Sequence, residues 1–431
     1  MPKEFEVRIL LLGCFVGEEK SSNITISSLF KDISVENIFI AATENEINEN
    51  LSENRVKNLV SSGQVWNISK NCIFKFDDET DGRLEVKKSI FSKFTNGFKK
   101  LLKKKIKDIV LFFEVSDLVI GKKGSVNFYK WVEMNNMKIC YSPLSNFYLI
   151  KEAKGLASNS NVRFLIHFFD NWVEELYLNV ESSFLRRCLG GRRILDSIFL
   201  LPAVYLVISE DMKIHYKARF AIESSVFHNL VNIEPGPFHE NKSKNKNYLR
   251  IGYFGRIGRG NENSLRLFAD CVDLYNKNEN RSKNVILEVY SKERLSTEDN
   301  YSVLFKPFIS QSNLKLEMRN CDLLLLPLDS EEESILFIKY SIPTKFTDYA
   351  SSSVPIISFG PADIAINRLI KSKRLCYFFE PQVENFSEVF EVFEKMPNKE
   401  ELVLNMMNYL KEELNAEKKR EELNTLINSL M

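Results

Sequence analysis

The sequence has few glycines, few histidines and almost no net charge, and each shortage excludes a class of function. Only 16 of its 431 residues are glycine, against a usual share of about 7%, so each glycine-containing turn is informative. The four histidines include no pair at metal-ligand spacing, which argues against a zinc enzyme. Lys and Arg total 59 against 58 for Asp and Glu, so no overall positive field favours nucleic acid. We expect neither a metal cofactor nor nucleic acid among its ligands.

Paired cysteines and long apolar runs are also missing. The seven cysteines form no CxxC motif and stand in apolar surroundings, which predicts buried thiols in a reducing compartment. The first residues lead into an apolar segment without the pattern of a signal peptide. The most apolar run, Ser197–Ser209, is too short to cross a bilayer. We therefore expect a cytoplasmic protein.

Short, continuously apolar runs alternate with helical patterns, which is typical of a doubly wound α/β architecture with buried parallel strands. A chain of 431 residues favours two or three domains at about 150 residues each. The pattern stops at Glu234-Pro-Gly-Pro237 and a polar stretch, then restarts. We predict two Rossmann-like domains facing each other across a cleft. The bounds are residues 1–233, a linker over 234–248, a second domain over 249–397 and a helical tail over 398–431.

The apolar runs predict the strands. In the first half these are Val7–Gly13, Asn37–Ala42, Ile109–Glu114, Lys138–Ser142, Val162–His167 and Tyr205–Ser209. In the second half they are Arg250–Phe254, Val285–Tyr290, Asp322–Pro327, Pro355–Phe359 and Leu375–Phe379.

The most informative glycine cluster follows the restart strand, in the segment RIGYFGRIGRGN that begins at Arg250. Its small and basic residues are Gly255, Arg256, Gly258, Arg259 and Gly260. Small residues, cations and a helix beginning near Asn263 form a combination that suits an anion. The spacing is not GxGxxG and lacks the Walker lysine. The alternative is an ordinary strand–helix turn with two solvated arginines.

A second cluster lies downstream, in CDLLLLPLD from Cys321 and SIPTKFTDYASSSVPIISFGP from Ser341. Thr344 and Lys345 would place free amides and a cation at a helix N-terminus. Asp348 falls one turn later, where a carboxylate can accept hydrogen bonds from sugar hydroxyls. Alone, Lys345 and Asp348 equally suit a pair on a helix surface.

Together these segments resemble GT-B glycosyltransferases, in particular the retaining, nucleotide-sugar-dependent enzymes that build bacterial surface polysaccharides. The resemblance covers most of residues 250–361. It implies that Gly255, Arg256 and Arg259 hold the donor diphosphate. Thr344 and Lys345 correspond to further phosphate and sugar contacts, and Asp348 to the glutamate that binds the donor ribose. The family generally needs no metal.

Two positions depart from the family pattern. An acidic residue eight positions before the ribose-binding glutamate is replaced by Tyr340, and a glycine is replaced by Ser353. One of Glu331–Glu333 is an alternative source of the missing carboxylate. The first departure keeps a non-catalytic GT-B subunit, which binds a glycan or a partner transferase, as a second interpretation. A sugar-nucleotide epimerase is a third.

The first half carries a weaker form of the same resemblance. Gly13 and Gly17 follow the first strand and resemble the glycine-bearing loop on the acceptor side. His167 ends a later strand and Asp170 follows it, a place where side chains reach the interdomain cleft. We predict that both take part in catalysis. The alternative for His167 is a structural histidine with satisfied hydrogen bonds.

Basic residues gather in two places in the first half. Residues 87–107 contain nine lysines and no acid, with apolar residues at three- and four-residue steps. This stretch, Lys87–Lys107, predicts either docking on an anionic membrane or an ordinary covering helix with solvated lysines. A second patch contains Arg186, Arg187, Arg192 and Arg193.

The combined prediction is an enzyme that moves a hexose-type sugar from a nucleotide diphosphate-sugar to a glycan or lipid-linked acceptor. It would work in bacterial surface polysaccharide synthesis, at the inner face of the cell membrane.

Overall fold

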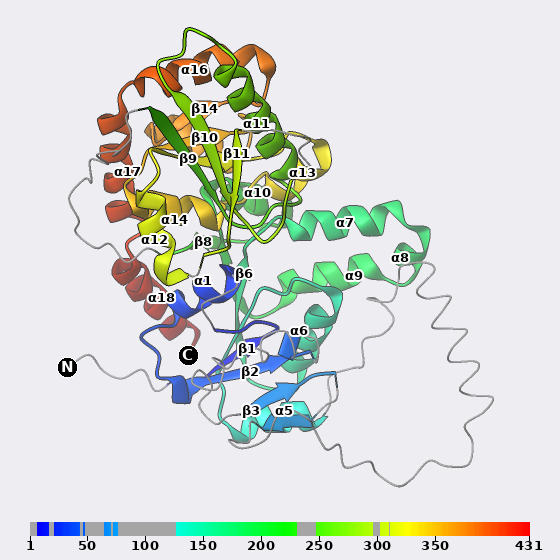
Figure 1. Ribbon diagram of the computed structural model, residues 1–431. Coiled ribbons are helices and arrows are strands. Elements are labelled where there is room, and N and C mark those ends of the chain that lie inside the picture. Colours follow the sequence, from blue (N-terminus) through cyan, green and yellow to red (C-terminus); the bar gives the residue numbers. More distant parts are fainter. Residues whose placement is uncertain are drawn as a thin grey trace, which may run out of the picture.

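The computed structural model describes residues 7–16, 21–43, 46–47, 64–69, 72–75, 126–230, 247–295, 302–309 and 311–431. These residues form two α/β domains, each built on one twisted sheet with helices packed against it (Figure 1).

The first domain contains an eight-stranded sheet in the order β4-β3-β2-β1-β5-β6-β7-β8. Its strands are β1 (Ile9–Leu12), β2 (Ile38–Ala42), β3 (Gln64–Asn67), β4 (Cys72–Lys75), β5 (Ile139–Ser142), β6 (Arg163–Phe168), β7 (Ala203–Val207) and β8 (Ser224–Val226). All neighbours pair in parallel except β3 and β4, which are antiparallel. Its helices are α1 (Ser21–Leu29), α5 (Val126–Met134), α6 (Phe147–Asn159), α7 (Trp172–Ser182), α8 (Phe184–Cys188), α9 (Gly191–Asp196) and α10 (Glu210–Phe220).

The second domain contains a fully parallel six-stranded sheet in the order β11-β10-β9-β12-β13-β14. Its strands are β9 (Tyr248–Phe254), β10 (Asn284–Tyr290), β11 (Val303–Lys306), β12 (Leu323–Pro327), β13 (Ile356–Phe359) and β14 (Tyr377–Phe379). Its helices are α11 (Glu262–Asn276), α12 (Gln311–Arg319), α13 (Glu332–Ile338), α14 (Thr344–Ser352), α15 (Ala365–Lys373), α16 (Phe386–Lys395) and α17 (Lys399–Glu413).

The strand order places a functional edge in each sheet. In each domain the first strand, β1 or β9, lies in the middle of the sheet. The following strands are added on one side of it and later strands on the other, so the strand order reverses beside β1 and beside β9. In doubly wound folds, the crevice at the carboxyl ends of the strands beside such a reversal is where ligands bind. The relevant edges are therefore the ends of β1 and β5 in one domain and of β9 and β12 in the other.

The C-terminal helices join the two domains. Helix α17 packs against α14 of the second domain, and the last helix, α18 (Ala416–Leu430), packs against α1 of the first. Leu423 and Ile427 of α18 are fully buried in the first-domain core. The predicted helical tail is thus a pair of helices whose second member returns to the first domain (Figure 1).

The predicted fold class, two Rossmann-like doubly wound domains, is confirmed. The strands that the prediction omitted are β3, β4, β8 and β11. The predicted strand Ile109–Glu114, the boundary at Glu234–Pro237 and the Lys87–Lys107 stretch lie outside the described residues. The expectation of uniformly buried thiols is wrong for Cys72 and Cys188, which are exposed. In the part of the chain that the structure describes, no helix combines the length and the apolar character needed to cross a bilayer.

Candidate functional site

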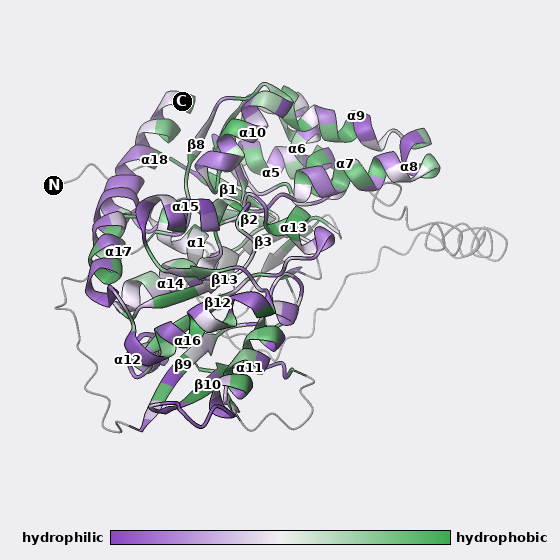
Figure 2. Cartoon of the chain, turned by 90° about the horizontal axis from the view of Figure 1, so that it is seen from above, coloured by the Kyte–Doolittle hydropathy of each residue, from purple (hydrophilic) through white to green (hydrophobic). Residues whose placement is uncertain are grey.

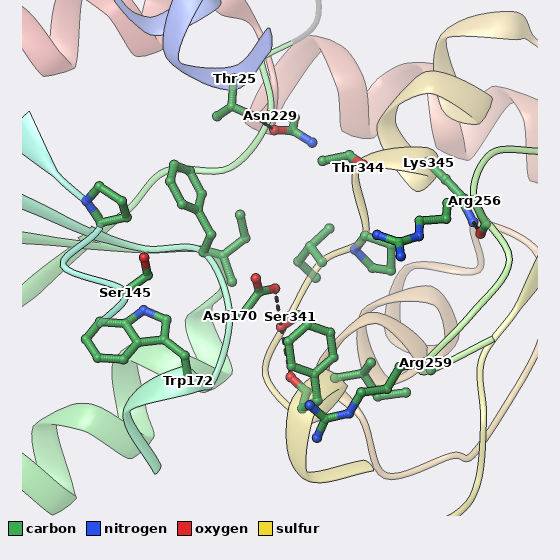
Figure 3. Close-up of a pocket in the computed structure, with 18 of the residues that line it drawn as sticks. Thr25, Ser145, Asp170, Trp172, Asn229, Arg256, Arg259, Ser341, Thr344 and Lys345 are labelled. Atoms are coloured by element: carbon green, nitrogen blue, oxygen red, sulfur yellow. Dashed lines mark hydrogen bonds between the residues drawn. The ribbon is translucent and has the colours of Figure 1, made fainter. Parts of the chain in front are cut away.

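A cavity of about 730 Å³ lies between the two domains and is lined by both. The first domain contributes residues that follow β1, β5 and β6, and the second contributes the loop after β9, the end of β12 and the start of α14. The cavity therefore occupies the position that the two strand orders predict for a ligand. Figure 3 shows Ser145, Asp170 and Trp172 on one side, facing Thr344, Arg256 and Arg259 on the other.

The glycine loop after β9 is held tightly against the start of α14. Gly255 has a φ of +130°, and a Cβ atom added there would lie 2.4 Å from the Cε of Lys345. A side chain at this position would therefore be strained and would displace Lys345. The side-chain oxygen of Asn261 accepts from the Gly258 amide at 3.1 Å, and its amide donates to the Arg256 carbonyl at 3.3 Å. These contacts fix the loop at the cavity wall.

Of the two helices that begin near this loop, α14 is the one whose first turn has no side-chain cap among the described residues and whose first residues line the cavity. The first turn of α11 is capped by Asp329, whose carboxylate accepts from the Ser264 amide at 2.8 Å. By contrast, Thr344 and Lys345, the first residues of α14, line the cavity. The first amides of a helix have no partner within the helix and carry a partial positive charge. An anion in the cavity would thus meet α14 rather than α11.

Lys345 is attached to the glycine loop rather than to Asp348. Its ammonium group donates to the Tyr253 hydroxyl and, at 3.1 Å, to the Arg256 carbonyl. It also lies 4.3 Å from the centre of the Tyr253 ring. Burial lowers the pKa of Lys345 from 10.5 to about 7, although Glu293 opposes the shift. This places a lysine with a poorly solvated ammonium beside the anion-accepting helix end, and the surface-pair alternative for Lys345 does not hold.

The two arginines of the loop differ in their surroundings. The Arg256 side chain is 87% exposed and lies 3.7 Å from Glu293, so it is available to a ligand in the cavity. Arg259 crosses to the first domain, where its guanidinium lies 2.5 Å from the Glu175 carboxylate of α7. It also stacks over Phe337 at 5.0 Å. Both line the cavity, but Arg259 already has a carboxylate partner that a ligand would have to share.

Asp348 lies one turn after Thr344 on α14 and does not line the cavity. Burial raises the pKa of its carboxyl group from 3.8 to about 7. The structure therefore places it behind the helix end and leaves its role toward a ribose as a proposal.

On the first-domain side, Asp170 faces the cavity and Gly13 lines it. Burial raises the pKa of Asp170 from 3.8 to about 6, and a hydrogen bond from the Ser341 hydroxyl, at 3.3 Å, opposes the shift. Gly13 has a φ of +71°, and a Cβ there would lie 2.4 Å from Leu149, so glycine is required where the chain leaves β1. Gly17, the other predicted acceptor-loop glycine, lies outside the described residues.

His167 is not brought to the cavity. It is fully buried in β6, its Nε2 donates to the Phe227 carbonyl and the Tyr141 hydroxyl donates to its Nδ1, both at 2.8 Å. Burial lowers the pKa of His167 to about 4, so the ring is neutral and both nitrogens are satisfied. These contacts fit the alternative interpretation of His167 as a structural histidine. Of the two residues predicted at the end of β6, Asp170 is the one that reaches the cavity.

Tyr340, which stands where the family has an acidic residue, contacts the first domain at the domain interface. Tyr340 stacks on His215 of the first domain with ring centres 4.5 Å apart, and its carbonyl accepts from the Ser209 hydroxyl at 2.6 Å. Glu331–Glu333 are exposed and do not line the cavity, so they do not replace the missing carboxylate. Asp170, hydrogen-bonded to the residue after Tyr340, is the carboxylate at this part of the cavity wall.

Several cavity residues were not predicted from the sequence, and two of them, Trp172 and Glu46, have notable surroundings. Trp172 lines the cavity, and its indole N–H has no hydrogen-bond partner within the described part of the chain. Glu46 also lines it, and it forms a reciprocal cap with Thr43, which donates its amide to the Glu46 carboxylate at 2.8 Å. The Thr-x-x-Glu spacing after a strand is the signal that could have identified Glu46. Among the described residues, no cluster of His, Cys, Asp and Glu has the arrangement of a metal site.

Comparisons with known proteins identify the fold. No protein-family model and no curated protein sequence matches the chain. Among solved structures, sucrose-phosphate synthase from Thermosynechococcus elongatus aligns over 99% of both chains with a TM-score of 0.60 and 11% identity.

Two further solved structures align over nearly their whole length. HepE from Anabaena, in complex with UDP-glucose, aligns over 98% of this chain and 100% of its own, with a TM-score of 0.56 and 11% identity. WaaG, a glycosyltransferase involved in lipopolysaccharide biosynthesis, aligns over 96% and 98%, with a TM-score of 0.56 and 9% identity. The structural alignments show that the chain has the two-domain GT-B fold of these glycosyltransferases. At identities this low, the comparison establishes the fold alone.

Proposed function

We propose that this chain is a glycosyltransferase that moves a hexose-type sugar from a nucleotide diphosphate-sugar to a glycan or lipid-linked acceptor. The observation that carries the proposal is the interdomain cavity, which has a volume of about 730 Å³. The N-terminus of α14, Lys345 and Arg256 line it on one side, and Asp170 lines it on the other. A diphosphate needs amides and cations on one side of such a cavity, and an acceptor hydroxyl needs polar groups on the other. Support also comes from HepE, which has been solved with UDP-glucose and with UDP.

The chemistry of the site is electrostatic. The α14 amides, the Lys345 ammonium and the Arg256 guanidinium would bind the diphosphate and stabilise its charge as it leaves. Asp348, one turn further along α14, would hold the donor ribose. Asp170, in its ionised form, would accept a hydrogen bond from a hydroxyl of the acceptor or of the transferred sugar, in the part of the cavity where Tyr340 supplies no carboxylate.

The domain interface favours a closed arrangement around the ligand. The contacts of Ser341 with Asp170, of Arg259 with Glu175 and of Tyr340 with His215 all cross the cleft. Closure excludes water, which strengthens each charged contact and limits hydrolysis of the donor. We place the reaction in the synthesis of a bacterial surface polysaccharide, at the inner face of the cell membrane. We expect retention of configuration, as the family resemblance implies.

A panel of nucleotide sugars tests the proposal. The purified chain is mixed with each donor, and the released nucleoside diphosphate is measured with and without candidate acceptors. One donor should be consumed, and the combined Arg256→Ala and Lys345→Ala variant should not consume it while its thermal unfolding remains cooperative. Unchanged turnover by this variant would show that the donor site is assigned wrongly.

A non-catalytic subunit is the second candidate function, and the position of Tyr340 favours it. Tyr340 is engaged with His215 rather than facing the cavity, so the site lacks a carboxylate that the family uses. The subunit would give no turnover with any donor, whereas an epimerase would convert the nucleotide sugar without an acceptor.

A further inference from the structure

Helices α7, α8 and α9 form an arm that projects from the first domain. Helix α8 lies at the outer end of this arm both in Figure 1 and in the view from above in Figure 2. The tip, residues 183–193, contains α8, the turn at Gly190 and the start of α9. None of its residues lines the cavity.

The turn at the tip has a defined geometry. The Ser183 hydroxyl caps α8 by accepting from the Arg186 amide at 3.4 Å. Gly190 has a φ of +76°, and a Cβ there would meet no atom within 4 Å. The left-handed turn reverses the chain between α8 and α9, so the side chains of both short helices gather at the end of the arm.

The tip exposes apolar side chains. Phe184 is 69% exposed and Leu189 is 45% exposed. Both side chains lie at the end of the arm and outside the core of the domain, where an apolar partner can reach them.

Cations surround these apolar side chains. Residues 183–193 include four arginines and no acid. Arg186 is turned toward the domain, 6.0 Å from the centre of the Phe147 ring, while Arg187, Arg192 and Arg193 are exposed. Glu181, at the end of α7, lies 4.0 Å from Arg192, but both side chains are largely solvated, at 47% and 65% exposure. Such a pair contributes little and leaves the arginine free to exchange its partner.

We propose that this tip docks on an anionic membrane surface, with Phe184 and Leu189 in the headgroup region and the three exposed arginines on lipid phosphates. Arginines are attracted to an anionic bilayer surface, and apolar side chains such as Phe and Leu bury at the boundary between the headgroups and the acyl chains. A stable protein interface needs about 800 Å² from each partner, or some 20–30 residues, which is more than a tip this short presents. The proposal rests on the location at the inner face of the cell membrane proposed above, and not on the transfer reaction itself.

Vesicle flotation with the full chain tests the proposal. The vesicles are phosphatidylcholine alone and phosphatidylcholine mixed with phosphatidylglycerol. The chain should float with the anionic vesicles, and added salt should release it. Charge reversal of Arg187, Arg192 and Arg193 to Glu should lower the partition coefficient at least a hundredfold, since each arginine removed accounts for about fivefold. Phe184→Ser should lower it about tenfold.

Two control variants separate the tip from general charge and from a protein partner. Reversal of Lys277, Lys395 and Lys411 in the second domain and α17 makes the same change in net charge and should leave flotation unchanged. Replacement of the three tip arginines by Lys should retain flotation, because a lipid surface responds to charge rather than to the guanidinium fork.

The outcomes decide the proposal. All variants keep residues 87–107, so that stretch is a constant background. Flotation of the arginine-to-Glu variant equal to that of the unmodified chain would overturn the assignment to the tip. Absence of flotation of the unmodified chain on anionic vesicles would overturn docking on lipid altogether. Donor turnover is measured separately, and its failure would leave the flotation result intact.

Discussion

Replacement of Lys345 by Met should change donor affinity and stability in opposite directions. The ammonium is poorly solvated, which lowers its pKa from 10.5 to about 7. A pKa lowered by folding means that the unfolded chain binds the proton more tightly. The unfavourable contribution of Lys345 to stability is therefore complete at and below pH 7, and it fades as the pH rises toward 10.5.

The size of the two effects follows from the contacts of Lys345. The lowered pKa corresponds to several kcal/mol of desolvation at neutral pH. Lys345 recovers about 2 kcal/mol through its hydrogen bonds and its contact with the Tyr253 ring. Met fills a similar volume without a charge, so Lys345→Met should raise the unfolding free energy by about 1–2 kcal/mol. A charge-assisted hydrogen bond to a phosphate contributes about 1.5–3 kcal/mol, so affinity for a nucleoside diphosphate should fall roughly tenfold to hundredfold.

Calorimetric titration with UDP and GDP and denaturant unfolding measure both quantities on the same samples. The gain in stability should be larger at pH 7 than at pH 10, because the ammonium of the unmodified chain deprotonates in between. Lys371→Met is the matched control: this exposed lysine lies 5.2 Å from the centre of the Phe378 ring, on α15, and its loss should change neither quantity. Lower stability together with unchanged nucleotide affinity in Lys345→Met would refute the reasoning.

Three other predictions concern neighbouring features. Gly255→Ala should destabilise the fold by about 1–3 kcal/mol, because alanine is strained at the positive φ of this residue, and it should impair nucleotide binding. Gly258→Ala is the control: an added Cβ there has no atom within 4 Å, so neither stability nor nucleotide binding should change. Denaturant unfolding and nucleotide titration measure the two effects. Burial lowers the pKa values of His167 and His228 to about 4 and about 3, so the unfolded chain takes up protons before the folded chain as the pH falls. The free energy of unfolding should therefore drop by about 2 kcal/mol per histidine between pH 7 and 5. An unfolding free energy that does not change over this range would contradict the burial argument. Asp170→Asn should leave nucleotide affinity intact and reduce transfer about a hundredfold; the rate of the unmodified chain should rise as the pH passes about 6, the pKa of Asp170, and that rise should be absent in the variant.

The sequence predicted the fold well because the signal is repeated in every unit. Runs such as Leu323–Leu326 are fully or almost fully buried, and a strand covered on both faces must be continuously apolar. The strands that were missed are short or lie at sheet edges: β4, β8 and β11 end their sheets, and β3 has only four residues. The edge strands are partly solvated, and β3, although buried, is too short to carry a comparable apolar pattern.

The site was predicted in part, and the failures have physical causes. The glycine loop and the start of α14 are local in sequence, so their anion-binding character could be inferred. The partners of His167 are Tyr141, on β5, and the carbonyl of Phe227, the residue that follows β8. A strand-end histidine is satisfied or functional depending on such distant partners, and the sequence does not reveal them. The same holds for Asp329, whose cap on α11 depends on contact between two loops.

The central claim, that a nucleotide sugar binds between the α14 terminus and the glycine loop, is tested most directly by donor turnover. The unmodified chain and the combined Arg256→Ala and Lys345→Ala variant are assayed against the same panel of nucleotide sugars, with Lys371→Met as the control. The account predicts that one donor is consumed by the unmodified chain and the control, and that the combined variant consumes none while it remains folded. Equal turnover by all three proteins, or no binding of any nucleoside diphosphate by the unmodified chain, would contradict it.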